Sequence, residues 1–446
     1  MECLILAAGE GSRLAKTAAS AKPLVRLLGV SLLERAIRAG MEAGAIAFVV
    51  VTGHRGEEVA AFAESLGVRL GVPVETVENT EWRRGNGMSL LAGRESLQTD
   101  RPFLVMMADH VVDPMLVRKV GEVHPPEGEI LLGVDPNCEN PLVDLDDVTK
   151  VQAEGGAIIA IGKQLDTYNG FDTGVFHCTN GIFSALERVE RDQESVGLSD
   201  GVQVLAAEGN AKTVNTGDAF WIDVDDSAAF DKAETVLIEQ LKSKPSDGPV
   251  SRYINRPLST RISRCLARHP VTPNQISLVS FGLSLLAALL FVWPHYLGLI
   301  LGGILAQFAS VIDGCDGEIA RLKYLQSKYG GWLDAVLDRY ADAFLLFGLT
   351  LHISHGNAGS ATLWIGFAAI IGSFMVSYTA DKYDGVMAKR IRPRKGFRVG
   401  RDVRVFLIFM GALANLPLVV LVVVAVLMNA ETVRRIILCR SAEPSY

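Results

Sequence analysis

The chain has 446 residues, 49% of them hydrophobic and 21% charged, with a mean hydropathy of +0.27. This combination argues against a uniformly soluble protein and against a pure membrane bundle, and the length suits two or three domains. A net charge of −7 gives no basic field, so we do not expect nucleic acid as a partner.

Residues 1–242 alternate short apolar runs with helical patterns, which predicts an α/β, Rossmann-like domain with crossover helices. Helical patterns cover 31–44 and 57–67. The apolar runs predict buried strands, the first three parallel, at 3–8, 45–53, 103–109, 158–165, 174–179 and 219–224. We interpret the first run as a strand and not as a signal peptide, because no basic leader precedes it.

The composition changes at 243–251, the sequence SKPSDGPVS, which is typical of a linker. Residues 252–268 contain several arginines and no acid, with apolar residues at near-helical spacing. This pattern favours a basic amphipathic helix on an anionic membrane surface over a solvated linker helix. The linker and this juxtamembrane helix together are expected to cover 243–270.

The last part of the chain, 271–446, predicts an all-α transmembrane domain of six helices. Several of its apolar segments approach the ~20 residues that cross a bilayer. They lie at 276–293, 297–318, 331–353, 359–380, 403–416 and 417–438. Lys and Arg gather in one set of connecting loops. The positive-inside rule therefore predicts a multi-pass cell-membrane protein with both termini and the first domain in the cytoplasm.

Glycines after the first predicted strand let backbone N–H groups approach a triphosphate. The expected nucleotide loop contains Ala7, Gly9, Gly11 and Ser12. Arg13 and Lys22 add the positive charge that a leaving pyrophosphate needs, so both are candidate catalytic residues. This segment resembles the sugar-nucleotidyltransferase superfamily, which has a Rossmann-like fold and transfers a nucleotidyl group from an NTP to a phosphorylated substrate.

That resemblance implies further site residues. Asp109 matches the first magnesium ligand of the superfamily, and Asp223 the second, with Asp225 as the alternative. Asn86 and Ser89 match a segment that reads the edge of a pyrimidine base. The expected contacts on the acceptor side are Lys163 and Asp172.

Four aspartates dominate the membrane part, two on each of two predicted helices: Asp313, Asp316, Asp334 and Asp338. Their spacing places each pair on one helix face. Acids at membrane depth need a partner, which bound divalent cations supply. Together with Gly317, Ala320 and Arg321 the pattern is identified as that of the CDP-alcohol phosphotransferase family, a six-helix fold usually found as a homodimer.

In that family's pattern, all four aspartates lie at the metals and Asp338 is also the expected general base. Gly317, Ala320 and Arg321 would line the CDP site. Lys382, Arg401 and Arg404 are candidates for binding the acceptor's phosphate, although the family's lysine position is occupied here by Ala380. Mg²⁺, with Mn²⁺ as the alternative, is the expected cofactor in both domains.

The order of the two domains resembles bifunctional enzymes that join an inositol-1-phosphate cytidylyltransferase to a di-myo-inositol phosphate phosphate synthase. The resemblance implies that CTP and inositol-1-phosphate give CDP-inositol. The inositol phosphate unit then passes to a second inositol-1-phosphate with release of CMP, giving a phosphorylated osmolyte. The alternative is a CDP-alcohol-dependent phospholipid headgroup synthase with a catalytic or regulatory nucleotidyltransferase domain.

Overall fold

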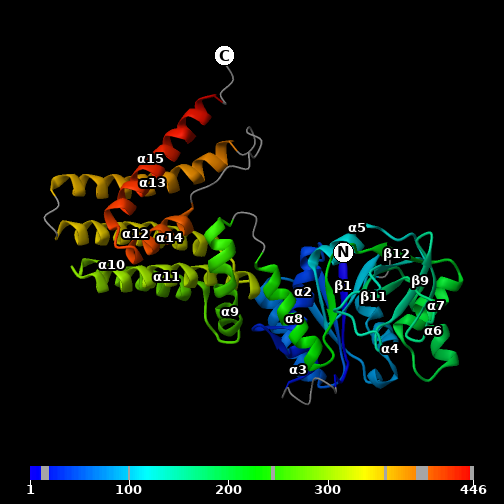
Figure 1. The fold of residues 1–446 in the computed structure, drawn as a ribbon. Coiled ribbons are helices and arrows are strands. Elements are labelled where there is room, and N and C mark those ends of the chain that lie inside the picture. Colours follow the sequence, from blue (N-terminus) through cyan, green and yellow to red (C-terminus); the bar gives the residue numbers. More distant parts are fainter. Residues whose placement is uncertain (12–19, 99–100, 243–246, 356–358, 388–399, 442–446) are drawn as a thin grey trace. The chain divides into compact units, whose positions relative to one another are not determined.

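The computed structural model describes residues 1–446 with six gaps, and for 381–387 and 439–441 the backbone alone. The gaps are 12–19, 99–100, 243–246, 356–358, 388–399 and 442–446. The chain forms two compact units, Met1–Val236 and Leu237–Tyr446. Figure 1 shows an α/β unit and a helical unit.

The first unit is built on a nine-stranded sheet with the order β5-β4-β1-β6-β11-β8-β12-β10-β9. The strands are β1 (Glu2–Ala7), β4 (Ala47–Thr52), β5 (Val74–Glu78), β6 (Phe103–Met107), β8 (Ile130–Asp135), β9 (Lys150–Glu154), β10 (Ala157–Gly162), β11 (Gly170–Cys178) and β12 (Ala211–Asn215). β1 pairs in parallel with β4 and β6, which confirms the three predicted parallel strands. β11 runs antiparallel to β6 and β8.

Helices cover both faces of this sheet (Figure 1). They are α2 (Leu32–Glu42), α3 (Gly56–Leu70), α4 (Asn86–Ala92), α5 (Pro114–Glu122), α6 (Gly181–Asp192), α7 (Leu198–Ala207) and α8 (Ser227–Gln240). Successive side chains of a strand point to opposite faces, so Leu4 joins one hydrophobic core and Ile5 the other. Ser31 begins α2 because its hydroxyl accepts a hydrogen bond from the backbone N–H of Glu34. The two predicted helices and the nucleotidyltransferase fold are thus confirmed.

Two small two-stranded sheets complete the unit. β2 (Arg26–Leu27) pairs with β3 (Val30–Ser31), and β7 (His110–Val112) pairs antiparallel with β13 (Trp221–Asp223). β7 follows the end of β6 directly. The second small sheet therefore brings a late segment of the chain to the carboxyl edge of the central parallel strands.

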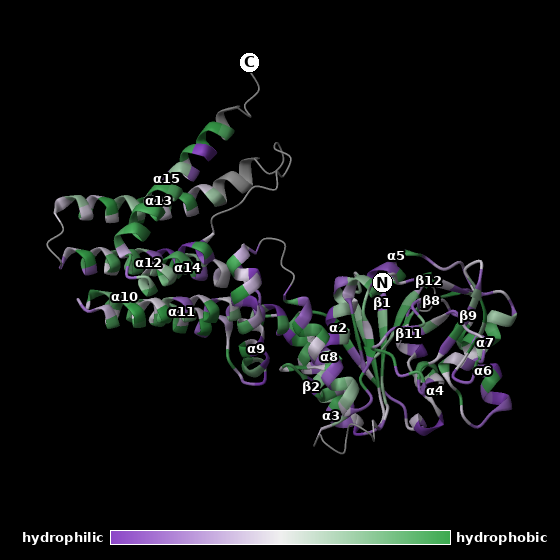
Figure 2. Ribbon diagram, in the orientation of Figure 1, coloured by the Kyte–Doolittle hydropathy of each residue, from purple (hydrophilic) through white to green (hydrophobic). Residues whose placement is uncertain are grey.

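The second unit consists of helices. After a π-helical turn at Ser251–Asn255 come α9 (Arg256–Ala267), α10 (Pro273–Val292), α11 (Tyr296–Leu322), α12 (Lys328–Ser354), α13 (Ser360–Met387), α14 (Arg401–Leu413) and α15 (Pro417–Ser441). α10 packs against α11 and α12, and α13 packs against α15. Figure 2 shows long hydrophobic stretches along α10, α11, α13 and α15.

Among the described residues, four helices are long and apolar enough to cross a membrane: α10, α11, α13 over Ser360–Ala380 and α15 over Pro417–Leu438. α12 has 27 residues but carries several charges, and α14 has only 13 residues. The sequence therefore predicted a helical membrane part correctly, whereas these two helices do not by themselves have the composition and length of a span.

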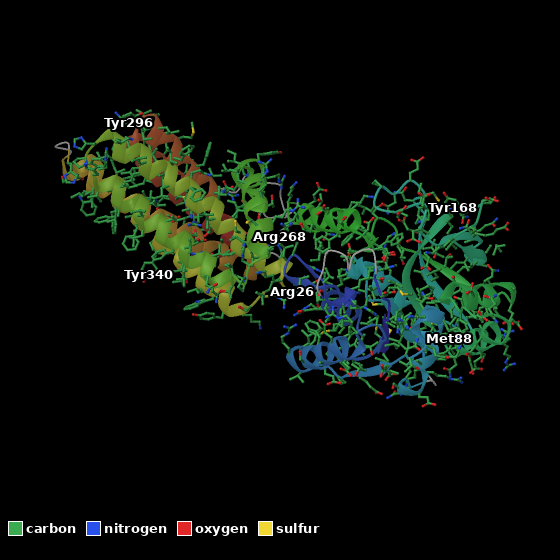
Figure 3. All side chains as sticks on the ribbon, turned by 90° about the horizontal axis from the view of Figure 1, so that it is seen from below. Arg26, Met88, Tyr168, Arg268, Tyr296 and Tyr340 are labelled. Carbon is green, nitrogen blue, oxygen red and sulfur yellow. The ribbon has the colours of Figure 1, made fainter. Side chains whose placement is uncertain are left out.

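Tyr296 and Arg268 lie at opposite ends of the helical unit (Figure 3). At the Tyr296 end, the phenol hydroxyl donates a hydrogen bond to the carbonyl oxygen of Leu413 at 2.6 Å. This bond ties the beginning of α11 to the end of α14. The two helices consequently run side by side, with the charged beginning of α14 directed away from Tyr296.

α9 packs against α11 through a face of small polar side chains, including Ser259 and Ser263. Its apolar Leu258 is exposed, as is Ile254 just before it. The position of this helix on a membrane surface stays a prediction.

A buried ion pair joins α9 to α11. The Arg256 guanidinium donates to Glu318 at 2.6 Å and to Asp247 at 2.7 Å, and Ser259 also donates to Glu318 at 2.6 Å. Glu318 is completely buried. Burial alone would lower the pKa of Arg256, but the two carboxylates raise it above its ordinary value. Arg256 thus neutralises a carboxylate that has no access to water.

We expect Arg256→Leu to destabilise the helical unit by about 3–5 kcal/mol, because it leaves Glu318 as an unpaired buried charge. The measurement is the thermal unfolding midpoint of the full chain in detergent. Arg261→Leu, on the exposed face of the same helix, is the matched control, with an expected change within about 0.5 kcal/mol. Equal midpoints for the two variants would contradict a stabilising role for the Arg256 pair.

Candidate active sites

A cavity of about 550 Å³ lies at the carboxyl edge of the central strands in the first unit. Its lining includes Asn86, Asp109, His110, Lys163, Asp172, Asp223 and Asp225. Asp109 follows β6, and the antiparallel register of β7 with β13 places Asp223 opposite His110. The fold therefore brings together acids that are more than a hundred residues apart in the sequence.

Lys22 lies among these acids. Its ammonium group is 2.6 Å from Asp109 Oδ2 and 3.9 Å from Asp223 Oδ1, and it also forms an ion pair with Asp225. Burial alone would lower the pKa of Lys22, but attraction to the three acids raises it. Gly11 has φ +61°, and a Cβ there would lie 2.6 Å from the Lys22 side chain, so glycine is needed for this close approach.

Asp109 remains ionised at neutral pH. Burial raises its pKa, but the positive charges of Lys22 and His110 outweigh that effect and lower the pKa to about 2. Asp225 shows the opposite result, because burial and the nearby Asp223 charge raise its pKa despite Lys22. The site thus keeps negative charge on Asp109, next to the buried Oδ1 of Asp223, which has no hydrogen-bond partner in the described part of the chain.

The sequence analysis did not identify His110 as a site residue. Its Nδ1 is 2.9 Å from the carbonyl oxygen of Thr173, and its Nε2 is 3.5 Å from Asp223 Oδ2 and 4.0 Å from Asp109 Oδ1. Burial lowers its pKa, but Asp223 and Asp109 raise it to about 10. A histidine directly after a candidate metal ligand was the signal available in the sequence.

The two residues predicted near the base, Asn86 and Ser89, form different hydrogen bonds. Asn86 lines the cavity, and its side-chain oxygen accepts a hydrogen bond from the backbone N–H of Leu198. Ser89 is 2% exposed, and its hydroxyl accepts from the side-chain amide of Asn79 at 3.0 Å.

Both residues predicted for the acceptor line the cavity, where Lys163 donates to Asp147 at 2.5 Å. Asp172 accepts from the backbone N–H of Gly174, and its burial raises its pKa to about 6. In the nucleotide loop, Ala7 is buried at the end of β1, and Gly9 follows that strand. Ser12 and Arg13 lie outside the described residues.

The helical unit contains a second cavity, of about 560 Å³, lined by residues of α9, α11, α12 and α14. Oxygens of Asp313, Asp316 and Asp334 lie within 4.8 Å of one another. Ser277 on α10 donates to Asp316 at 2.6 Å, and Ser280 donates to Asp313 at 3.1 Å. These hydroxyls fix the two α11 carboxylates toward α12.

The Arg401 guanidinium contacts three aspartates of this cavity. Its Nη1 lies 2.6 Å from Asp313 Oδ2 and 2.7 Å from Asp338 Oδ1, and its Nε lies 3.3 Å from Asp342. Arg404 donates to Asp342 at 2.5 Å. Both arginines predicted for the acceptor thus line the cavity while contacting carboxylates. Asp342, four residues after Asp338, was not predicted, although it continues the same helix face.

A neighbouring cavity of about 300 Å³ is lined by Gly317, Ala320 and Arg321 together with Asp316 and Asp334. The three residues predicted for the CDP site therefore border the carboxylate group. An Arg321 Nη2 atom is buried without a hydrogen-bond partner among the described residues. The side chain of Lys382 lies outside the described residues.

Both carboxylate groups fit a divalent cation. Carboxylate oxygens are the ligands that Mg²⁺ and Mn²⁺ prefer, and the groups Asp109, His110, Asp223 and Asp313, Asp316, Asp334 each offer three ligand atoms within 4.8 Å. The two sites lie in different units of the chain. Each is therefore equipped for phosphoryl chemistry by itself.

Comparison with known proteins matches each unit to a family. Residues 3–146 match the MobA-like NTP transferase domain, and residues 270–434 match the CDP-alcohol phosphatidyltransferase family. The chain is 38% identical to the bifunctional IPC transferase and DIPP synthase of Rubrobacter xylanophilus, over 97% of this chain and 95% of that protein. The protein of the same name from Aquifex aeolicus is 33% identical, over 98% and 97%. The inositol-1-phosphate CTP transferase structure from T. maritima is 28% identical and covers 53% of this chain and 94% of that one, with a TM-score of 0.48.

Proposed function

Since this chain belongs to the family of bifunctional IPC transferases and DIPP synthases, we propose that it makes CDP-inositol from CTP and inositol-1-phosphate and then consumes it. The chain is a nucleotidyltransferase joined to a CDP-alcohol phosphotransferase. The observation that carries the proposal is the similarity over nearly the whole length of both relatives, which includes both carboxylate sites.

In the first reaction, a phosphate oxygen of inositol-1-phosphate attacks the α-phosphorus of CTP, and pyrophosphate leaves. Lys22, held among the acids, stabilises the charge that develops on the leaving group. Asp109 and Asp223 would hold a divalent cation, which would supply positive charge beside the α-phosphate of the transferred cytidylyl group. Asp225 is the alternative ligand, and Asn86 and Ser89 are proposed near the base. Lys163 and Asp172 border the acceptor side of the same cavity.

In the second reaction, a hydroxyl of the acceptor inositol-1-phosphate attacks the phosphorus that carries inositol, and CMP leaves. Asp338 takes the hydroxyl proton. Asp313, Asp316 and Asp334 would hold the cation or cations, which would supply positive charge for the oxygens of the transferred phosphate. Gly317, Ala320 and Arg321 bind the CDP part. Arg401, Arg404 and Lys382 are proposed for the acceptor phosphate.

The chain is a membrane protein, with four apolar helices and a CDP-alcohol phosphotransferase domain. We further propose six membrane helices, a homodimer through this domain, and a cytoplasmic position for both termini and for the nucleotidyltransferase. Mg²⁺ is the proposed cofactor of both domains, with Mn²⁺ as the alternative.

The test is to incubate membranes containing the protein with CTP and labelled inositol-1-phosphate, and to partition the product between water and organic solvent. We expect a CTP-dependent, water-soluble product. Label in the organic phase would support the phospholipid headgroup synthase instead. Product formation from CDP-inositol alone, with none from CTP, would indicate a regulatory first domain.

The proposed domains predict a result for the isolated first part. We expect residues 1–242, expressed alone, to be soluble and to form CDP-inositol, because residues 1–236 form a compact unit with its own core. The fragment must end before Asp247, because Asp247 forms an ion pair with Arg256 in the helical unit. Solubility and CTP-dependent pyrophosphate release are the measurements. An insoluble fragment would contradict this boundary.

A further inference from the structure

We propose that His110 is a metal ligand through Nε2, and that the nucleotidyltransferase site therefore binds Mn²⁺ more tightly, relative to Mg²⁺, than a site with oxygen ligands alone. The inference rests on the proposed function, because the cation concerned is the one held by Asp109 and Asp223. It adds a nitrogen ligand to those two carboxylates, and it distinguishes this site from the membrane site, whose candidate ligands are all aspartates.

The distances suit one shared ion. His110 Nε2 is 3.5 Å from Asp223 Oδ2 and 4.0 Å from Asp109 Oδ1. Ligand atoms about 2.1 Å from one cation lie about 3.0 Å apart when adjacent and about 4.2 Å apart when opposite. The oxygens that face His110 are also not those nearest to Lys22, which approaches Asp109 Oδ2 and Asp223 Oδ1. Lys22 and a cation can therefore use different oxygens of the same carboxylates.

The imidazole ring is held in the orientation that a metal ligand needs. Nδ1 donates to the carbonyl oxygen of Thr173 at 2.9 Å, which fixes the ring with Nε2 on the side of the two carboxylates. Metal-binding histidines typically make such a bond with the other ring nitrogen. Gly174 makes room for the ring: it has φ +74°, and a Cβ there would lie 2.4 Å from Nδ1. The antiparallel pairing of β7 and β13 fixes His110 opposite Asp223.

Nitrogen ligation changes which ion the site selects. Mg²⁺ keeps water and carboxylate ligands, whereas affinity for an imidazole-containing site rises from Mn²⁺ along the first transition row. A proton and a divalent cation compete for the same Nε2 lone pair, so cation binding releases that proton. The two sites of one chain would then differ in metal preference.

The test is pulsed electron paramagnetic resonance of the full-length protein in detergent, loaded with Mn²⁺. We expect modulation from a directly bound imidazole nitrogen, which changes frequency when the protein is made with ¹⁵N-histidine. This readout uses the unaltered protein and so does not depend on how a variant folds. The membrane site adds no such signal, because its candidate ligands are oxygens.

His110→Gln should remove the nitrogen modulation and reduce the preference for Mn²⁺ over Mg²⁺ in competition binding by about tenfold or more. His124→Gln is the matched control, since His124 is an exposed histidine of the same unit that does not line the cavity. It should retain both properties. One outcome would overturn the His110 assignment alone. In it, Asp109→Asn loses Mn²⁺ binding, but the unaltered protein shows no nitrogen modulation. If Asp109→Asn bound as much Mn²⁺ as the unaltered protein, both the assignment and the proposed metal site would fail.

Discussion

Asp338→Asn is expected to reduce the turnover of supplied CDP-inositol by about 10²–10⁴-fold, which corresponds to about 3–5 kcal/mol in the activation barrier. Asparagine keeps the shape of the side chain but cannot accept the proton of the attacking hydroxyl. Asp338 is also not part of the close group formed by Asp313, Asp316 and Asp334, and it contacts that group through Arg401. Binding of the CDP-alcohol should therefore be largely retained.

Asp313→Asn is the comparison that separates a base from a metal ligand. Asp313 belongs to the close carboxylate group, so its replacement should weaken metal and donor binding together. Donor affinity and turnover are measured for both variants over a Mg²⁺ titration. Recovery of Asp338→Asn at high Mg²⁺, or substantial turnover at any concentration, would make Asp338 a metal ligand and not the base.

Asp109→Asn is expected to abolish CTP-dependent formation of CDP-inositol, with a loss of at least about 10²–10³-fold in kcat. The substitution removes a carboxylate charge that binds the cation and pairs with Lys22. Lys22 retains Asp225 as an ion-pair partner, so the local fold should persist. Pyrophosphate release from CTP and inositol-1-phosphate measures the effect.

The same variant should still convert supplied CDP-inositol at the rate of the unaltered protein, because its second carboxylate group lies in the other unit. Product formation from CDP-inositol is therefore the internal control. A parallel loss of this second activity would show that the two sites are not independent. Unchanged activity with CTP would remove Asp109 from the metal site.

The sequence predicted the backbone framework because that framework depends on local patterns. An apolar run followed by small or polar residues identified β1, β4 and β6. Aspartates at helical spacing identified the α11 and α12 carboxylates, since residues three or four apart share a helix face. Both predictions depend only on spacing within one helix or strand, and the regular geometry of that element fixes where such residues lie.

The partners of charged side chains could not be predicted in the same way. Arg401 and Arg404 stay predicted phosphate ligands, but their contacts with Asp342 come from the packing of the helices and could not be predicted. His110 acquires its neighbours from the register of β7 with β13, which no local pattern contains. The burial of Ser89 also comes from the packing of its helix, whereas its predicted role near the base rests on the resemblance of its segment and stays a prediction.

The hydrogen bond between Tyr296 and Leu413 lies at the end of the helical unit from which the depth of the carboxylates in a membrane can be counted. Tyrosine favours the boundary between lipid and water, and α11 rises about 25 Å from Tyr296 to Asp313 at ~1.5 Å per residue. A hydrocarbon layer about 30 Å thick then ends only about one helical turn beyond Asp313. In the proposed topology, Asp313 then lies just inside the edge of the hydrocarbon layer. A water-soluble donor would therefore have to enter that layer by only about one helical turn to reach this carboxylate.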